Sequence, residues 1–140
     1  PPGASPGGCL AGGGALGFLS PVIDFSDVEG EYFRVAVRAH DHSAMRQVYA
    51  YTDGAGIARL FTEAAEQWKG WQEAKVWETL EGELRIELSI DRLGHVCVAI
   101  RVRSDPGGSD RWQLDAELGL DAGQLDDVAR EANRLWCCGG

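Results

Sequence analysis

The sequence is short of basic residues and contains no long apolar run. Of its 140 residues, 13 are Lys or Arg and 22 are Asp or Glu, which gives a formal net charge of -9. Nucleic-acid phosphates are bound by clustered Lys and Arg, so this balance argues against a direct nucleic-acid partner. No stretch is long and apolar enough to span a membrane as a helix, so we expect no membrane partner either. An acidic surface keeps a protein soluble and attracts basic partners.

The sequence has no CxxC pair, and the spacing of its cysteines argues against two common uses of this residue. The four cysteines are Cys9, Cys97, Cys137 and Cys138. Two of them are adjacent and no CxxC pair occurs, so the spacing fits neither a disulfide framework nor a zinc site. A reducing compartment suits such thiols, and the first 20 residues lack the basic start and unbroken apolar run of a signal peptide. We therefore expect a cytoplasmic protein.

Glycine and proline are concentrated at the beginning of the chain. Residues 1–20 bury too little apolar surface to offset the entropy of ordering, so we expect a disordered Pro/Gly-rich tail. Residues 21–136 have the size of one domain, and residues 137–140 are expected to be a frayed C-terminus. A domain of this length buries enough surface to fold without a metal or a disulfide.

Apolar and polar residues alternate in several segments, which is typical of antiparallel strands with one buried face. The expected strands cover 33–40, 45–51, 84–90, 95–102 and 111–118. Short glycine-containing turns at 81–82 and 91–94 indicate hairpins. On the polar side we expect a solvent-exposed checkerboard of opposite charges, formed by Arg85, Glu87, Arg101, Arg103, Asp115 and Glu117.

Two other segments, 57–68 and 125–136, show the three- and four-residue spacing of amphipathic helices. Asp121 and Gln124 precede the second helix in the spacing of a capping box. The element order predicts an α+β domain, in which an antiparallel sheet of about five to seven strands, joined by meander hairpins, has two helices packed on one face. Trp68 belongs to the first helical stripe and should join a core that includes Phe33, Val35, Leu60, Phe61, Ile86, Val98, Leu114 and Val128.

Four short motifs follow one another in the second half of the chain: WKGW at 68–71, KVWE at 75–78, LGHV at 93–96 and LDAGQL at 120–125. Their order resembles that of an uncharacterised family, domain of unknown function 6228, and the resemblance extends more loosely over residues 33–51. The LGHV strand and the last helix resemble, more distantly, immunity proteins of the WapI type, which are associated with neutralising bacterial toxins. Neither resemblance implies a catalytic residue or a cofactor.

The residues that could carry chemistry form no complete site. His40 and His42 share one face of an extended segment, but the sequence nominates no further metal ligand. His95 and Cys97 share one strand face, yet a thiolate needs a histidine within hydrogen-bond reach and a third group that orients it. We therefore predict no catalytic, cofactor-binding or metal-binding residues. The alternative is a small metal-dependent or thiol enzyme that uses His40 and His42, or His95 and Cys97.

A contact zone for a protein partner is predicted near the end of the first helix. Trp71 lies beyond that helix, where periodicity gives it no reason to be buried, and Glu63, Glu66, Glu73 and Glu78 are close to it in sequence. The competing interpretation is that Trp71 closes the end of the sheet. The sequence thus favours a non-catalytic protein-binding module, with an immunity-type inhibitor of a basic protein as one form. A self-associating housekeeping domain is a further alternative.

Overall fold

The computed structural model of the chain describes residues 8–11, 22–39, 41–50, 55–105 and 107–138. The five alternating segments form strands as predicted, and together with three further strands they make two antiparallel four-stranded sheets. With two α-helices, they give the expected α+β class. Neither helix of the described segments has the length and apolar character that a membrane crossing requires.

The first sheet consists of β1 (Gly8–Ala11), β2 (Val22–Glu29), β3 (Tyr32–Arg38) and β4 (Ser43–Tyr49), in that spatial order. Each strand pairs with its neighbour in sequence, so the sheet is a meander. The inward side chains of β2 and β3, such as Phe25 and Val35, are fully buried. The polar residues between them face solvent, which is the pattern that the alternation predicts.

The second sheet consists of β5 (Lys75–Glu78), β6 (Leu84–Ile90), β7 (His95–Arg103) and β8 (Gln113–Asp121). It too is a meander with consecutive antiparallel pairing. Gly94 adopts a φ of 86° in the turn between β6 and β7, a left-handed conformation that glycine adopts without steric cost.

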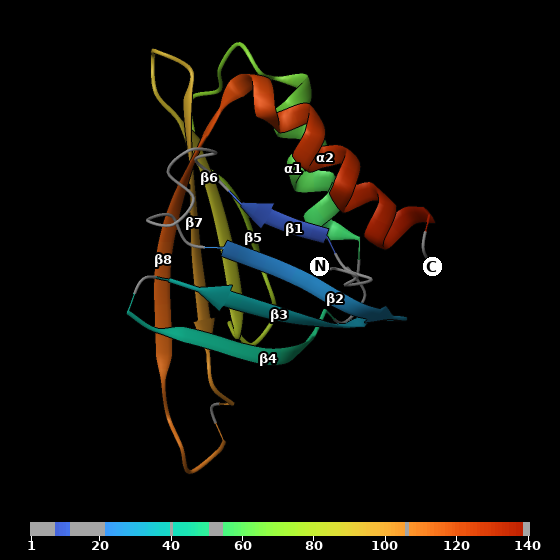
Figure 1. Cartoon of the computed structure of the whole chain (residues 1–140), viewed down its shortest axis with the longest axis vertical. Helices are drawn as coiled ribbons and strands as arrows, with labels where there is room; N and C mark the ends of the chain where they lie inside the picture. Colours follow the sequence, from blue (N-terminus) through green and yellow to red (C-terminus); the bar gives the residue numbers. More distant parts are fainter. Residues whose placement is uncertain (1–7, 12–21, 40, 51–54, 106, 139–140) are drawn as a thin grey trace.

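The helices are α1 (Gly56–Glu66) and α2 (Leu125–Asn133), which is preceded by the 3-10 turn η2 (Ala122–Gln124) and followed by the π-helical turn η3 (Arg134–Cys138). α1 and α2 lie side by side, with α1 next to β5 and α2 next to β1 (Figure 1). The predicted capping-box residues stand at the start of η2, where the Asp121 backbone N–H donates to Gln124 Oε1 at 2.8 Å.

The core lies between the two sheets, whose strands cross one another steeply (Figure 1). Phe33 of the first sheet and Trp77 of the second pack with ring centroids 6.3 Å apart. Trp136 of η3 adds edge-on contacts to Phe25 and Phe33, at 5.3 and 5.4 Å. Aromatic side chains bury large areas, so this cluster links both sheets to the end of the chain.

The arrangement of the strands differs from the prediction in two respects. Seven strands lie within the segment that was expected to be ordered, but they divide into two facing sheets instead of forming one. The helices consequently cover the side of the molecule next to β1 and β5, and the buried face of each sheet is covered largely by the other sheet. Alternation shows which face of a strand is buried, but it does not show whether a helix or a second sheet covers that face.

The prediction for the core is confirmed only in part, and that for the N-terminal tail is wrong for the part that the structure describes. The predicted core is buried, although Val128 is only partly so. Trp68 is 55% exposed, because α1 ends at Glu66 and the helical stripe stops before the tryptophan. Within the predicted tail, Gly8–Ala11 pairs with β2 as an eighth strand, and the other residues of that tail lie outside the described part of the chain.

Candidate functional site

The solvent-facing side of the second sheet carries charged residues in two rows that cross all four strands. The strand register places Glu78, Arg85, Arg101 and Asp115 in the first row, and Val76, Glu87, Ala99 and Glu117 in the second. The predicted charged residues therefore lie on the solvent-facing side, but their signs do not alternate as a checkerboard. Arg85 and Arg101 occupy directly opposite positions on β6 and β7, where like charges destabilise a strand pair unless carboxylates compensate them.

Carboxylates on the same face compensate both arginines. Arg85 Nη1 lies 2.8 Å from Glu87 Oε1, and its Nε lies 4.0 Å from Glu78. Arg101 Nε donates to Asp115 Oδ1 at 2.8 Å, and Gln113 donates to the other oxygen of Asp115 at 2.7 Å. The hydrogen bond from Arg101, followed by that from Gln113, lowers the pKa of Asp115 from its ordinary value of 3.8.

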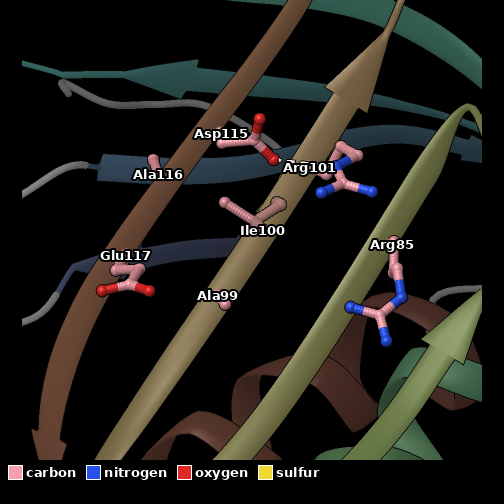
Figure 2. Close-up of a pocket in the computed structure, with 7 residues that line it drawn as sticks. All are labelled: Arg85, Ala99, Ile100, Arg101, Asp115, Ala116 and Glu117. Carbon is pink, nitrogen blue, oxygen red and sulfur yellow. Dashed lines mark hydrogen bonds and ion pairs between the residues drawn. The ribbon is translucent and has the colours of Figure 1, made fainter.

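A hollow of about 400 Å³ opens on this face around the short side chain of Ala99. Figure 2 shows that its lining comes from β6, β7 and β8, with the Arg101–Asp115 pair at one side and Glu117 at the other. Among the described residues, Glu117 has no hydrogen bond or ion pair. The hollow thus offers donors and acceptors to a polar partner group, and its lining side chains include neither a serine nor a cysteine nucleophile.

The structure does not bring the predicted contact zone together. Trp71 is half-buried, its indole Nε1 donates to the Leu88 carbonyl at 3.3 Å, and it packs against the core. This supports the competing interpretation, in which Trp71 closes the end of the sheet. Glu63 and Glu66 are exposed on α1, Glu73 is exposed before β5, and Glu78 lies on the charged sheet face beside Arg85. Within the described residues no hydrogen bond or ion pair connects any two members of this zone.

Trp68 was predicted to be part of the core, and this prediction is wrong. The tryptophan follows the end of α1 and is exposed, and Lys69 Nζ lies 5.6 Å from its ring centroid. The spacing from Ala64 and Ala65 to Trp68 continued the buried stripe, so the pattern gave no sign that the helix stops at Glu66. Gly70, with a φ of 137°, marks the end of the helical region, but it lies two residues after Trp68 and so did not place the tryptophan outside the helix.

The histidine and cysteine candidates remain separate. His40 lies outside the described residues, and His42 is exposed. His95 Nδ1 lies 3.2 Å from Asp91 Oδ2, an interaction within the β6–β7 turn. Burial, and then the charges of Glu117 and Glu87, raise the pKa of the Cys97 thiol from 9.0, so the thiolate is disfavoured. In the segments that the structure describes, no three His, Cys, Asp or Glu side chains are grouped as metal ligands.

The fold and this surface define a small acidic α+β domain with a charged, solvent-facing sheet. The model of the family of unknown function DUF6228 matches residues 12–136, and the chain belongs to this family. The resemblance inferred from the four sequence motifs is thereby confirmed and extends over most of the chain. No curated protein matches the sequence, so the more distant resemblance to WapI-type immunity proteins stays a prediction.

Proposed function

We propose that this domain is a non-catalytic protein-binding module that engages a basic partner through the surface at the end of α1. The observation that carries the proposal is the exposure of Trp68, which is 55% accessible while Trp71 and Trp77 pack against the core. An exposed tryptophan can bury a large apolar area against a partner, and tryptophan is enriched among the residues that dominate binding energy.

Two carboxylates that precede Trp68 favour a basic partner, and they outnumber the adjacent Lys69, whose Nζ lies 5.6 Å from the Trp68 ring centroid. Glu63 and Glu66 are exposed one helical turn apart on α1, just before the tryptophan, and the whole chain has a formal net charge of -9. Carboxylates at the rim of an interface raise the rate of encounter with a positively charged protein, and salt screens this effect. Immunity-type inhibition of a basic toxin is the form of this function that the WapI-type resemblance suggests.

The enzyme alternative has weaker physical support. A thiol nucleophile requires a lowered pKa, whereas burial and two glutamates raise that of Cys97. His95, which shares its strand face, interacts with Asp91 in the turn. These contacts give a protein-binding role the stronger support of the two.

The experiment is a pull-down from cells of the source organism, followed by affinity measurements on the recovered partner. Trp68→Ala should weaken binding by roughly tenfold or more, the loss of about 1.4 kcal/mol expected of a central interface residue. Leu80→Ala is the matched control, because Leu80 is 82% exposed in the turn after β5. The proposal is contradicted if both substitutions weaken binding equally, or if neither of them weakens it.

A charge series tests the nature of the partner. Glu63→Lys with Glu66→Lys should slow association, and the difference from the unaltered chain should shrink as salt shortens the Debye length from about 10 Å at 0.1 M to about 3 Å at 1 M. Glu81→Lys with Asp110→Lys, at exposed positions in the turn after β5 and in the loop between β7 and β8, is the charge-matched control because it also reverses two charges. An acidic partner, or binding that is insensitive to salt, would rule out the electrostatic part of the proposal.

A further inference from the structure

Two of the four sheet edges in the described structure are not covered by a helix. α2 lies next to the β1 edge of the first sheet and α1 next to the β5 edge of the second. β4 and β8 are the other outer strands, and each makes its extensive contacts within its own sheet (Figure 1). An uncovered edge presents backbone N–H and C=O groups that can pair with a further strand.

The hydrogen-bond pattern identifies the β4 residues that face outward. The Ala50 N–H donates to the Glu31 carbonyl at 2.8 Å, so Ala50 and the residues two, four and six positions before it direct their backbone groups toward β3. Ser43, Met45 and Gln47 therefore direct theirs to the free edge. Within the described segments, Met45 has no hydrogen bond at this edge, and the Gln47 carbonyl accepts one from Arg46 Nε.

β4 has few of the devices that block edge-to-edge pairing in natural sheets, which are prolines, lysines, bulges and inward-pointing charges. It contains no proline and no lysine, and its register with β3 runs unbroken from Tyr32–Tyr49 to Arg38–Ser43. Its one such device is Arg46, which points inward toward Glu83 and the Arg103 carbonyl. A strand that pairs with this edge must therefore displace the Arg46 Nε hydrogen bond from the Gln47 carbonyl, which costs part of the interface energy.

The charge distribution favours a second copy of this chain as the partner that pairs with the β4 edge. A chain with a net charge of -9 repels its own copies over most of its surface, but β4 has no acidic residue and the outward residues of β3 beside it are Tyr32, Arg34, Ala36 and Arg38. β8, in contrast, carries Asp115, Glu117 and Asp121 on alternate positions, and two copies of that edge would repel each other. Met45, 58% exposed, and the exposed rings of Tyr32 and Tyr49, whose centroids lie 4.8 Å apart, add apolar surface on β4 and on β3 beside it.

We propose that β4 pairs antiparallel with β4 of a second copy around a two-fold axis at Met45, which joins the two first sheets into one continuous eight-stranded sheet. In this register each Met45 lies opposite Met45 of the second copy, and Ser43 lies opposite Gln47. The arrangement is closed and self-complementary, as a two-fold interface must be. One short strand pair buries less than the standard interface of about 800 Å² per partner, so the dimer is weak.

Sedimentation velocity over a concentration series tests the dimer. The unaltered chain should pass from monomer to dimer between about 10 μM and about 1 mM, the range of a small interface. Met45→Pro should abolish the dimer, because it removes an N–H that faces the free edge and takes no part in the pairing with β3. Met45→Ala, the matched control, loses the side chain but keeps the N–H, and should still dimerise.

Further variants keep the test decisive. If Met45→Pro fails to fold by circular dichroism, Met45→Glu with Gln47→Glu replaces it, because these exposed positions tolerate charge while two charged edges repel. Met45→Cys, in a chain whose native cysteines are serine, should form a disulfide-linked dimer on mild oxidation, whereas Arg34→Cys on β3 should not. A chain that is monomeric at about 1 mM, or a Met45→Pro variant that folds and dimerises like the unaltered chain, overturns the proposal. The first result would favour a strand of another protein as the occupant.

Discussion

Arg46 of β4 and Glu83, the residue before β6, form an ion pair between the two sheets. Arg46 Nη2 lies 3.8 Å from Glu83 Oε2, and Arg46 Nη1 donates to the Arg103 carbonyl at 2.6 Å. The Glu83 side chain is only 9% exposed and that of Arg46 is 21% exposed. The pair thus places a cation beside a nearly buried carboxylate that has no other ion pair among the described residues, at the edge of the core where β4 meets the second sheet.

Replacing Arg46 by methionine should destabilise the fold by about 3 kcal/mol, because the change leaves the Glu83 carboxylate buried without a partner. Chemical denaturation measures the loss. Arg34→Met is the matched control: the Arg34–Asp27 pair on the other face of the first sheet is exposed, and its removal should cost less than about 1 kcal/mol. Adding Glu83→Gln to Arg46→Met should recover part of the loss. Equal small losses in both single variants would contradict this account.

The core between the sheets predicts a large effect at Leu88, which is fully buried on the inward face of β6. Leu88→Ala should cost roughly 2–5 kcal/mol, the range for removing a buried leucine side chain. Leu80→Ala makes the same chemical change at a position that is 82% exposed and should alter stability by less than about 0.5 kcal/mol. Thermal and urea denaturation of the two variants should separate them clearly, and similar midpoints would show that Leu88 is not part of a packed core.

The sequence predicted strands correctly where one face of the strand is buried and the other is exposed to solvent. Phe33 to Val37 and Leu84 to Leu88 alternate because solvent lies on one side of each strand and the opposite sheet on the other. The placement of Arg85 and Arg101 on the same face of the sheet followed from the same periodicity, whereas the register that sets them opposite each other did not. β5 was not predicted as a strand, because its four residues are too few to show an alternation of apolar and polar side chains. Trp77 on this strand is nevertheless buried.

What the sequence did not contain is the identity of the element that covers each buried face. Pairing of β2 to β4 and of β5 to β8 is local, whereas the contact between Phe33 and Trp77 joins positions 44 residues apart. The hollow over Ala99 likewise requires three strands in register. Trp68 was wrongly predicted to be buried, because the helical spacing of apolar residues continues past Glu66, where the helix ends.

Gly82 should resist substitution more than Gly94, although both have left-handed backbones, with φ of 76° and 86°. A Cβ on Gly82 would lie 2.5 Å from Arg103 Nη2, whereas a Cβ on Gly94 meets nothing within 4 Å. Gly94→Ala should therefore cost about 1 kcal/mol from backbone strain alone. Gly82→Ala should cost more, because the Arg103 side chain must also leave the Gly82 carbonyl that it binds at 3.1 Å. Equal losses in urea denaturation would show that Arg103 moves without cost.

The Arg101–Asp115 pair predicts an acid dependence of stability. The pKa of Asp115 in the folded protein lies below its ordinary value of 3.8, because Arg101 and Gln113 donate to the carboxylate. A lowered pKa stabilises the fold above the unfolded value, and this contribution disappears as the pH falls below 3.8 and through the folded pKa. The side chain is more than half exposed, so the contribution is less than about 1 kcal/mol.

The measurement compares Asp115→Asn with the unaltered chain in urea denaturation from about pH 6 to about pH 2. The stability difference should be largest at the upper end and should shrink toward the acid end. Asp110→Asn, at an exposed loop position for which the structure shows no ion pair among the described residues, is the control and should track the unaltered chain throughout. A difference that stays constant with pH would mean that the carboxylate charge is not what Arg101 stabilises.

Cys97 should react slowly with iodoacetamide, because burial raises the pKa of its thiol above 9.0 and the negative charges of Glu117 and Glu87 raise it further. Glu117→Gln removes one of those charges, so the pH midpoint of alkylation should fall and the rate at neutral pH should rise. Glu73→Gln, an exposed position before β5, serves as the control and should leave both unchanged. Mass spectrometry of the Cys97 peptide separates this reaction from those of Cys9, Cys137 and Cys138.

The same measurement discriminates between the two functions considered for this domain. A midpoint below that of a free cysteine would indicate an activated thiolate and favour the thiol enzyme, whereas a raised midpoint that falls in Glu117→Gln fits a half-buried, unactivated cysteine on the charged face of the second sheet.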